Sequence, residues 1–187
     1  KWRWDTNAGL DQLLTRRIGE NELSAIEVMR AYVAAQLEYA ERPRDGNSIQ
    51  YARRLMSREG RKDGLYWPAD AAKGEEASPF GPLVAESAPY LEGHQPGDAY
   101  RGYHFKILTR QGKNAPGGAH SYVINGRMIA GFALVAYPAR YGESGVMTFM
   151  VSHNGRIYER DLGRNSTAIG LKMTSFDPGP GGSALQE

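Results

Sequence analysis

Two Asn-Gly pairs in the second half of the chain constrain its fold more than any other feature. Asn125-Gly126 and Asn154-Gly155 each lie between two short segments of apolar, β-forming residues. Because Asn and Gly tolerate the positive φ angles of a type I′ turn, each pair in this setting predicts a β-hairpin. The second half of the chain is therefore expected to form an antiparallel sheet.

Three further segments have the residue pattern of strands. Residues 103–108 alternate with a period of two, residues 131–137 are almost continuously apolar, as in a central strand, and residues 146–151 are rich in β-forming residues. A turn over residues 138–145 would join the last two. We expect a meander of about four to five antiparallel strands within residues 101–162, with an apolar face that needs a cover.

The first half of the chain has helical periodicity instead, and its clearest helix spans residues 21–42 before Pro43. Apolar residues recur along it at spacings of three and four: Leu23, Ile26, Met29, Val33 and Leu37. The opposite face carries polar residues: Glu22, Glu27, Arg30, Gln36 and Glu38. The apolar face of this helix is the expected cover of the sheet.

Shorter helices are expected elsewhere, each marked by a residue suited to a helix start: Asn7, Ser48, Pro82, and either Asn165 or Ser166. Gly19 is expected to end the first of them. The Pro- and Gly-rich tail that follows the last helix is expected to be loose.

The length of 187 residues is that of one domain, so we expect a single soluble α+β domain over residues 1–187. Its parts would be a helical region (1–60), a loop-rich connection (61–100), the sheet (101–162), and a short helix with a tail (163–187). No apolar run approaches the roughly 20 residues of a spanning helix, so no membrane span is expected.

The charge balance argues against a nucleic-acid partner, because 23 Lys and Arg against 21 Asp and Glu give a net charge of only +2. Three basic pairs in the helical region have the pattern of solvated helix faces: Arg16-Arg17, Arg53-Arg54 and Arg61-Lys62. The chain contains no cysteine, which excludes disulfides and thiol chemistry.

The N-terminal residues indicate a fragment of a longer precursor. The first residue is Lys1 rather than Met, and residues 1–5 alternate basic and aromatic side chains like the end of a strand whose partners are missing. A signal peptide would then lie outside the numbered chain.

Motifs along nearly the whole chain resemble a bacterial family known as domain of unknown function 2950. The resemblance is carried in the first half by Arg17-Ile18-Gly19, Asn21-Glu22-Leu23, Ala31-Tyr32-Val33 and residues 63–68, and in the second by residues 102–109, 117–118, 125–128, 131–138 and 145–149. Members are generally exported envelope proteins with an additional N-terminal region. The resemblance therefore implies a periplasmic or cell-envelope location, and it implies no chemistry.

This chain departs from the family pattern at residues 44–48, where relatives often have a more acidic Asp and Gly loop. The departure argues against a calcium loop at that place. A looser resemblance, in the order of helix and strand motifs, is to the globular part of type IV pilin-like proteins. The chain lacks the apolar N-terminal half-helix by which pilins assemble, so the resemblance implies a pilin-like fold and no filament.

No residue set has the spacing of a known catalytic or metal-binding motif. The histidines, His94, His104, His120 and His153, do not fall at the three- or four-residue spacing of helical ligands. We therefore expect no metal and no cofactor. Ser144 lacks the Gly-x-Ser-x-Gly pattern of a nucleophile elbow.

Aromatic and arginine side chains are better candidates for a binding surface, since these residue types dominate interface energetics. Together with two histidines, the candidates are Tyr66, Trp67, His104, His120, Arg127, Tyr137, Arg140 and Tyr141. Trp67, which precedes Pro68, has the alternative role of an anchor in the core.

The leading hypothesis is a noncatalytic exported domain that binds an envelope protein or a small molecule. The alternative is a hydrolase of unknown substrate that uses His104 or His120 with Asp161.

Overall fold

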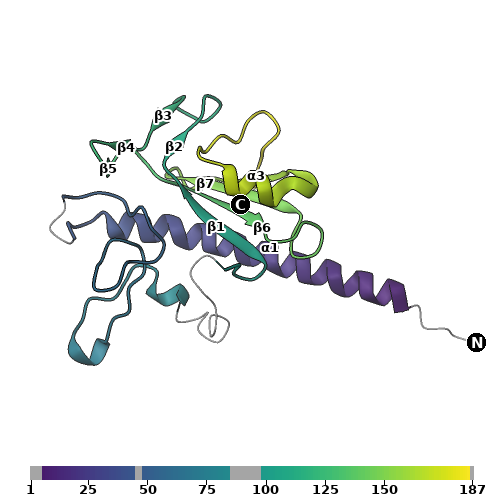
Figure 1. The fold of residues 1–187 in the computed structure, drawn as a ribbon, viewed down its shortest axis with the longest axis horizontal. Helices are drawn as coiled ribbons and strands as arrows, with labels where there is room; N and C mark the ends of the chain where they lie inside the picture. Colours follow the sequence, from purple (N-terminus) through teal and green to yellow (C-terminus); the bar gives the residue numbers. More distant parts are fainter. Residues whose placement is uncertain (1–5, 45–47, 85–97, 186–187) are drawn as a thin grey trace, which may run out of the picture.

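The computed structural model describes residues 6–44, 48–84 and 98–185, and it confirms an α+β fold (Figure 1). The long helix α1 (Thr6–Tyr39) crosses one face of a five-stranded antiparallel sheet. The short helix α3 (Ser166–Lys172) packs on the interior strand β6 (Ala133–Pro138) from the other face. In Figure 1 the first turns of α1 extend beyond the sheet toward the N-terminus.

The main sheet has the strand order β1-β6-β7-β8-β9. Its strands are β1 (Tyr103–Leu108), β6 (Ala133–Pro138), β7 (Met147–Ser152), β8 (Ile157–Asp161) and β9 (Ser183–Ala184). Strand β6, which lies between β1 and β7 inside the sheet, is buried along its whole length, as its apolar sequence predicts. The strands from β6 to β8 form the expected meander, while β1 joins it across a long excursion in the chain.

That excursion contains two small two-stranded sheets, one of β2 (Arg110–Gln111) with β3 (His120–Ser121) and one of β4 (Val123–Ile124) with β5 (Arg127–Met128). Two single turns of 3₁₀-helix also occur, η1 (Ala71–Lys73) and η2 (Gly163–Asn165).

Both Asn-Gly pairs form strand-to-strand turns, as expected. Asn125 and Gly126 have φ angles of 50° and 78°, which is the pattern of a type I′ turn between β4 and β5. At the second pair only Gly155 has a positive φ, of 76°, and its N–H donates to the carbonyl of Ser152. The type I′ geometry is therefore wrong for the second hairpin, whose longer loop uses a single left-handed glycine.

The expected break at Gly19 is wrong, because α1 continues through it as one helix of 34 residues. A glycine inside a helix costs about 1 kcal/mol relative to alanine, and the packing of a long helix outweighs that cost.

The helix expected from Ser48 is also wrong, so residues 48–60 do not belong to a helical region. The backbone of this segment is hydrogen-bonded to distant residues instead: the N–H of Tyr51 donates to the carbonyl of Met128 at 2.8 Å. The N–H and carbonyl of Ala52 are hydrogen-bonded to the carboxamide of Gln36, both at 2.8 Å. Tertiary hydrogen bonds thus take the place of those that a helix would supply.

The face of α1 that covers the sheet differs from the expected one. Leu23 and Leu37 are 64% and 52% exposed, Ile26 and Val33 are partly buried, and of the five expected positions Met29 alone is fully buried. The buried face consists of Ser24, Ala25, Val28, Met29, Tyr32, Ala35, Gln36 and Tyr39. Gln36, expected on the polar side, has no exposed surface.

Small and hydrogen-bonding side chains explain why α1 buries this face. Ala25 and Ala35 are small enough to let the helix approach the sheet closely, and the polar groups of Tyr32 and Gln36 find hydrogen-bond partners. The Tyr32 hydroxyl donates to the carbonyl of Ala133 at 3.1 Å, and Gln36 Nε2 donates to the Tyr32 hydroxyl at 3.0 Å. Because the buried polar groups of Tyr32 and Gln36 are paired on this face, it can face the sheet, and the face that carries Leu23 and Leu37 is left to solvent.

The C-terminal region is more ordered than expected. The last helix is confirmed as α3, although the Asn165 side chain makes no capping hydrogen bond. After it, Phe176 is fully buried, and β9 adds a fifth strand to the sheet, so the expectation of a loose tail is wrong over residues 173–185. The helix expected at Pro82 is present over residues 81–84.

Several expectations fall outside the described residues: the strand end at residues 1–5, the turn at residues 45–47, and His94. Among the residues that are described, no helix combines the length and the apolarity needed to cross a membrane.

Replacing Met29 by Ala should lower the free energy of unfolding by about 2–5 kcal/mol, because it leaves a cavity between α1 and the sheet. Replacing Leu37 by Ala should change it by no more than about 0.5 kcal/mol, since Leu37 is exposed. Urea unfolding of both variants measures the difference. A Leu37→Ala variant as unstable as Met29→Ala would contradict the observed helix face.

Candidate functional site

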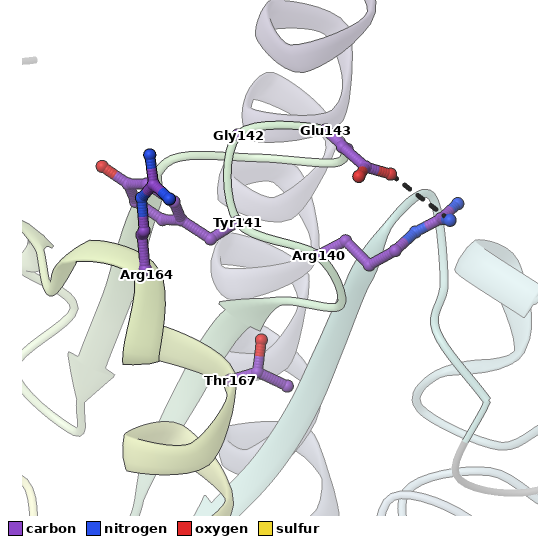
Figure 2. A pocket seen from close by; sticks show the side chains of 6 residues that line it. All are labelled: Arg140, Tyr141, Gly142, Glu143, Arg164 and Thr167. Atoms are coloured by element: carbon purple, nitrogen blue, oxygen red, sulfur yellow. Dashed lines mark ion pairs between the residues drawn. The ribbon is translucent and has the colours of Figure 1, made fainter.

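Two of the candidate residues, Arg140 and Tyr141, line a hollow of about 460 Å³ between the β6–β7 turn and the start of α3 (Figure 2). The other lining residues are Gly142, Glu143, Arg164 and Thr167. Figure 2 shows Arg164 beside Tyr141, while Arg140 extends in the opposite direction toward Glu143. The hollow is therefore open, with a cation and an aromatic ring on one side and an ion pair on the other.

Ser144 fixes the conformation of the β6–β7 turn. Its Oγ accepts a hydrogen bond from the N–H of Arg140 at 2.9 Å and lies 3.0 Å from the carbonyl of the same residue, to which it donates. The N–H of Gly142 donates to the carbonyl of Gly145 at 2.9 Å. Ser144 thus has a structural role that agrees with the absence of a nucleophile motif around it.

Helix α1 binds the backbone of the β6–β7 turn through three side chains. Asn21 Nδ2 donates to the carbonyl of Ser144 at 2.9 Å, and Arg17 donates to the carbonyl of Glu143 at 3.2 Å. Glu22 Oε1 accepts the N–H groups of Val146 and Met147 at 2.9 and 3.0 Å. A carboxylate that accepts two backbone N–H groups forms charge-assisted bonds, which are the stronger kind.

Tyr103 completes this contact from β1. Its hydroxyl lies 2.8 Å from the carbonyl of Met147, to which it donates, and burial raises the pKa of the phenol well above its usual value. A side chain at Gly145 would collide with this hydroxyl, so the close approach of the turn to Tyr103 requires glycine.

The polar groups around the hollow differ in how fully they are engaged. The Tyr141 hydroxyl donates to Asp161 Oδ2 at 3.1 Å, and this hydrogen bond raises the pKa of Tyr141. Arg140 forms an exposed ion pair with Glu143 at 3.3 Å. Arg164 has no ion pair in the described part of the chain. The guanidinium of Arg164 is therefore available to a ligand.

Tyr137 and His104 lie together on the face of the sheet that α3 covers, with ring centroids 5.5 Å apart. Tyr137 is only 5% exposed, and Gly170 of α3 packs so closely on its ring that a side chain there would collide with it. Burial raises the pKa of Tyr137. Tyr137 was expected on the surface, but it is a contact between α3 and the sheet.

Trp67 is also buried, at 4% exposure, and its indole Nε1 donates to the carbonyl of Glu76 at 2.8 Å. Its alternative role as an anchor of the loop region therefore fits the geometry. The guanidinium of Arg44 lies 5.6 Å from the Trp67 ring centroid and 4.7 Å from that of Tyr39. Tyr66, half-buried, forms an isolated bridge with Met56.

Glu76 ties this loop region to the end of α1, a role that no sequence pattern indicated. Its carboxylate lies 2.8 Å from Lys62, 3.3 Å from Arg44 and 3.6 Å from Arg42. The hydrogen bond from Lys62, with the charges of the two arginines, holds the pKa of Glu76 below its ordinary value of 4.5. These partners come from two segments that are both distant from Glu76 in the sequence, so their convergence depends on the fold.

His120 and Arg127 are exposed on the two small sheets, away from the β6–β7 turn. Arg127 donates to the hydroxyl of Ser48. His120 and His153 both contact the ring of Tyr122, with centroids 5.5 and 5.8 Å from it. Burial and the neighbouring His120 lower the pKa of His153. No group of three or more possible metal ligands occurs among the described residues.

The register of the sheet separates His104 from Asp161. β1 and β8 are three strand spacings apart in the sheet, which is about 14 Å. Asp161 also lies on the opposite face of the sheet from His104. Glu159 pairs with Phe149, which pairs with Ala136, so Glu159 and Asp161 lie on the face of Ala136. His104 pairs with Tyr137, the next residue of β6, whose side chain points to the other face. His120 shares the ring of Tyr122 with His153, which follows the last residue of β7, whereas Asp161 pairs with Met147 at the first residue of that strand. Neither histidine forms a catalytic pair with Asp161, whose carboxylate instead binds Tyr141 and the N–H of Gly163.

Comparison with known proteins identifies a family. The family model described as "Protein of unknown function (DUF2950)" matches residues 1–184, which confirms the resemblance found in the sequence motifs. No curated protein and no solved structure matches the chain, so the pilin-like resemblance is unconfirmed.

Replacing Glu76 by Gln should lower the free energy of unfolding at pH 7 and make that free energy less sensitive to acid. The folded-state pKa of Glu76 lies below the unfolded value, so its stabilisation is present above about pH 4.5 and is lost as the pH falls through the folded pKa. Urea unfolding between pH 7 and 3 measures the effect, with Glu41→Gln, an exposed carboxylate near the same end of α1, as the control. An identical acid dependence in the wild-type and Glu76→Gln proteins would show that the network is not formed.

Proposed function

We propose that the chain, which belongs to the DUF2950 family of proteins of unknown function, is a noncatalytic exported domain that binds a protein or small molecule of the cell envelope. The observation that carries this proposal is the hollow at the β6–β7 turn, where Tyr141 and Arg164 lie side by side on a rigid support (Figure 2). Export is supported by the family resemblance of the sequence.

The β6–β7 turn, which carries Tyr141, is held rigidly, and this favours binding of a ligand. The backbone of the turn is fixed by Ser144 and by Asn21 and Glu22 of α1, so little conformational entropy is lost when a ligand is bound. Tyr141 has two side-chain torsions and is further held by its hydrogen bond to Asp161. Rigid aromatic side chains next to arginine are typical of the residues that dominate binding energy.

The charges in the hollow favour a partner with an acidic group. Arg164 has no ion pair among the described residues, and the exposed pair of Arg140 with Glu143 contributes at most about 1 kcal/mol, so a carboxylate of the partner can replace Glu143. Thr167 has its hydroxyl engaged with the carbonyl of Pro138 and serves to shape the wall. We therefore expect an acidic site on the partner to contact Arg164 and the Tyr141 ring.

The test is capture of an envelope component by the immobilised chain, followed by the affinity of variants for the purified component. Arg164→Glu and Tyr141→Ala should each weaken binding about tenfold or more, because each removes a contact at the centre of the hollow. Arg61→Glu, at an exposed arginine of the loop region, makes the same charge change elsewhere and should leave binding unchanged.

Equal binding by all three variants would contradict this surface. Turnover of a substrate that is abolished by His104→Ala or His120→Ala would contradict the noncatalytic role itself.

A further inference from the structure

A second hollow, of about 740 Å³, lies between α1, the β7–β8 turn and the C-terminal strand β9. Its wall includes Arg30, Asn154, Arg156, Ile157, Ala184 and Leu185. It is separated from the hollow at the β6–β7 turn by the length of β7, about 17–20 Å for six residues. The two hollows are therefore independent sites.

Every polar side chain that lines this second hollow presents a hydrogen-bond donor. Arg30 and Arg156 form no ion pair in the described part of the chain. Asn154 Oδ1 accepts hydrogen bonds from the hydroxyl of Ser152 at 3.0 Å and from the N–H of Arg156 at 3.1 Å. Since both of these bonds engage its oxygen, the carboxamide NH₂ group is the part of Asn154 left for a ligand.

The carboxylates closest along the same elements do not neutralise the two arginines. Glu27 precedes Arg30 by about one helical turn, and Glu159 of β8 lies three residues after Arg156 of the β7–β8 turn, yet neither forms an ion pair with a guanidinium within the described residues. Two positive charges that have no ion pair within the described residues repel each other on one hollow, and a bound anion removes that repulsion.

The hollow has a fixed apolar floor as well. Ile157 is buried, and its carbonyl accepts the N–H of Leu185 at 3.0 Å, which holds the C-terminal segment against β8. The β7–β8 turn is closed by the bond from the N–H of Gly155 to the carbonyl of Ser152 at 2.9 Å. Leu185 packs against the core beside this floor. A ligand would thus meet rigid apolar groups below and donors at the rim.

We propose that this hollow binds an organic anion, with a carboxylate or phosphate group held by Arg30, Arg156 and Asn154 and an apolar body on Ile157 and Leu185. Guanidinium groups match the planar carboxylate and the phosphate oxygens through paired hydrogen bonds. The volume lies within the range of about 300–1,000 Å³ that is usual for small-molecule sites.

The experiment is titration of ¹⁵N-labelled protein with four probes, acetate, benzoate, inorganic phosphate and phenyl phosphate, monitored at the backbone amides of residues 153–157 and the Nε–H groups of Arg30 and Arg156. Saturable shifts are expected, with benzoate and phenyl phosphate binding more tightly than the anions without a ring. The tighter of these two identifies the preferred anionic group. Arg30→Gln and Arg156→Gln should each weaken binding about tenfold or more.

The matched control is Arg16→Gln, at an exposed arginine of the same helix, which should leave the affinity unchanged. Failure of all four probes to give saturable shifts would overturn the proposal, as would equal weakening by Arg16→Gln, which would show attraction to the overall charge. Because the readout lies at Arg30 and Arg156, this result is independent of binding at Arg164 and Tyr141.

Discussion

Hydrogen bonds between polar side chains on the sheet-facing side of α1 and backbone groups far away in the sequence determine how the rest of the chain is arranged. Glu22 accepts the N–H groups that begin β7, Tyr32 donates to the first residue of β6, and Gln36 satisfies both backbone groups of Ala52. Each bond leaves a buried group unsatisfied if it is broken, which costs about 1–3 kcal/mol. The apolar contacts of α1 stabilise the fold, and these bonds fix its position along the sheet.

The parts of the fold that depend on local rules could be predicted from the sequence. The Asn-Gly turns, the strand alternation after Tyr103 and the apolar interior strand β6 require only the conformational preferences of neighbouring residues. The buried face of α1 could not be chosen in this way, because two faces have helical spacing. The sheet selects the one where Tyr32 and Gln36 find hydrogen-bond partners, and no local pattern contains that information. The same bonds explain why Ser48 does not start a helix.

The candidate site was predicted only in part, for a related reason. Arg140 and Tyr141 lie inside the predicted turn over residues 138–145, so their surface position follows from local structure. Arg164 is brought beside Tyr141 (Figure 2) by the packing of α3 on β6, and Arg30 meets Arg156 only through the tertiary fold. Trp67 and Tyr137 are residue types that are common in binding surfaces, yet both are buried. Their burial depends on contacts with Glu76 and Gly170, respectively. Residue type indicates what a side chain can do, and packing determines whether it is accessible.

The most direct test of the account is hydrogen exchange at the amides of Val146 and Met147, the groups by which Glu22 holds the β6–β7 turn on α1. The account predicts that both amides are protected in the wild-type protein. In Glu22→Ala their exchange should accelerate about 10- to 100-fold, while the amides of the β4–β5 hairpin remain unchanged. Rapid exchange of both amides in the wild-type protein, or equal protection in Glu22→Ala, would contradict the claim that α1 positions the turn through this carboxylate.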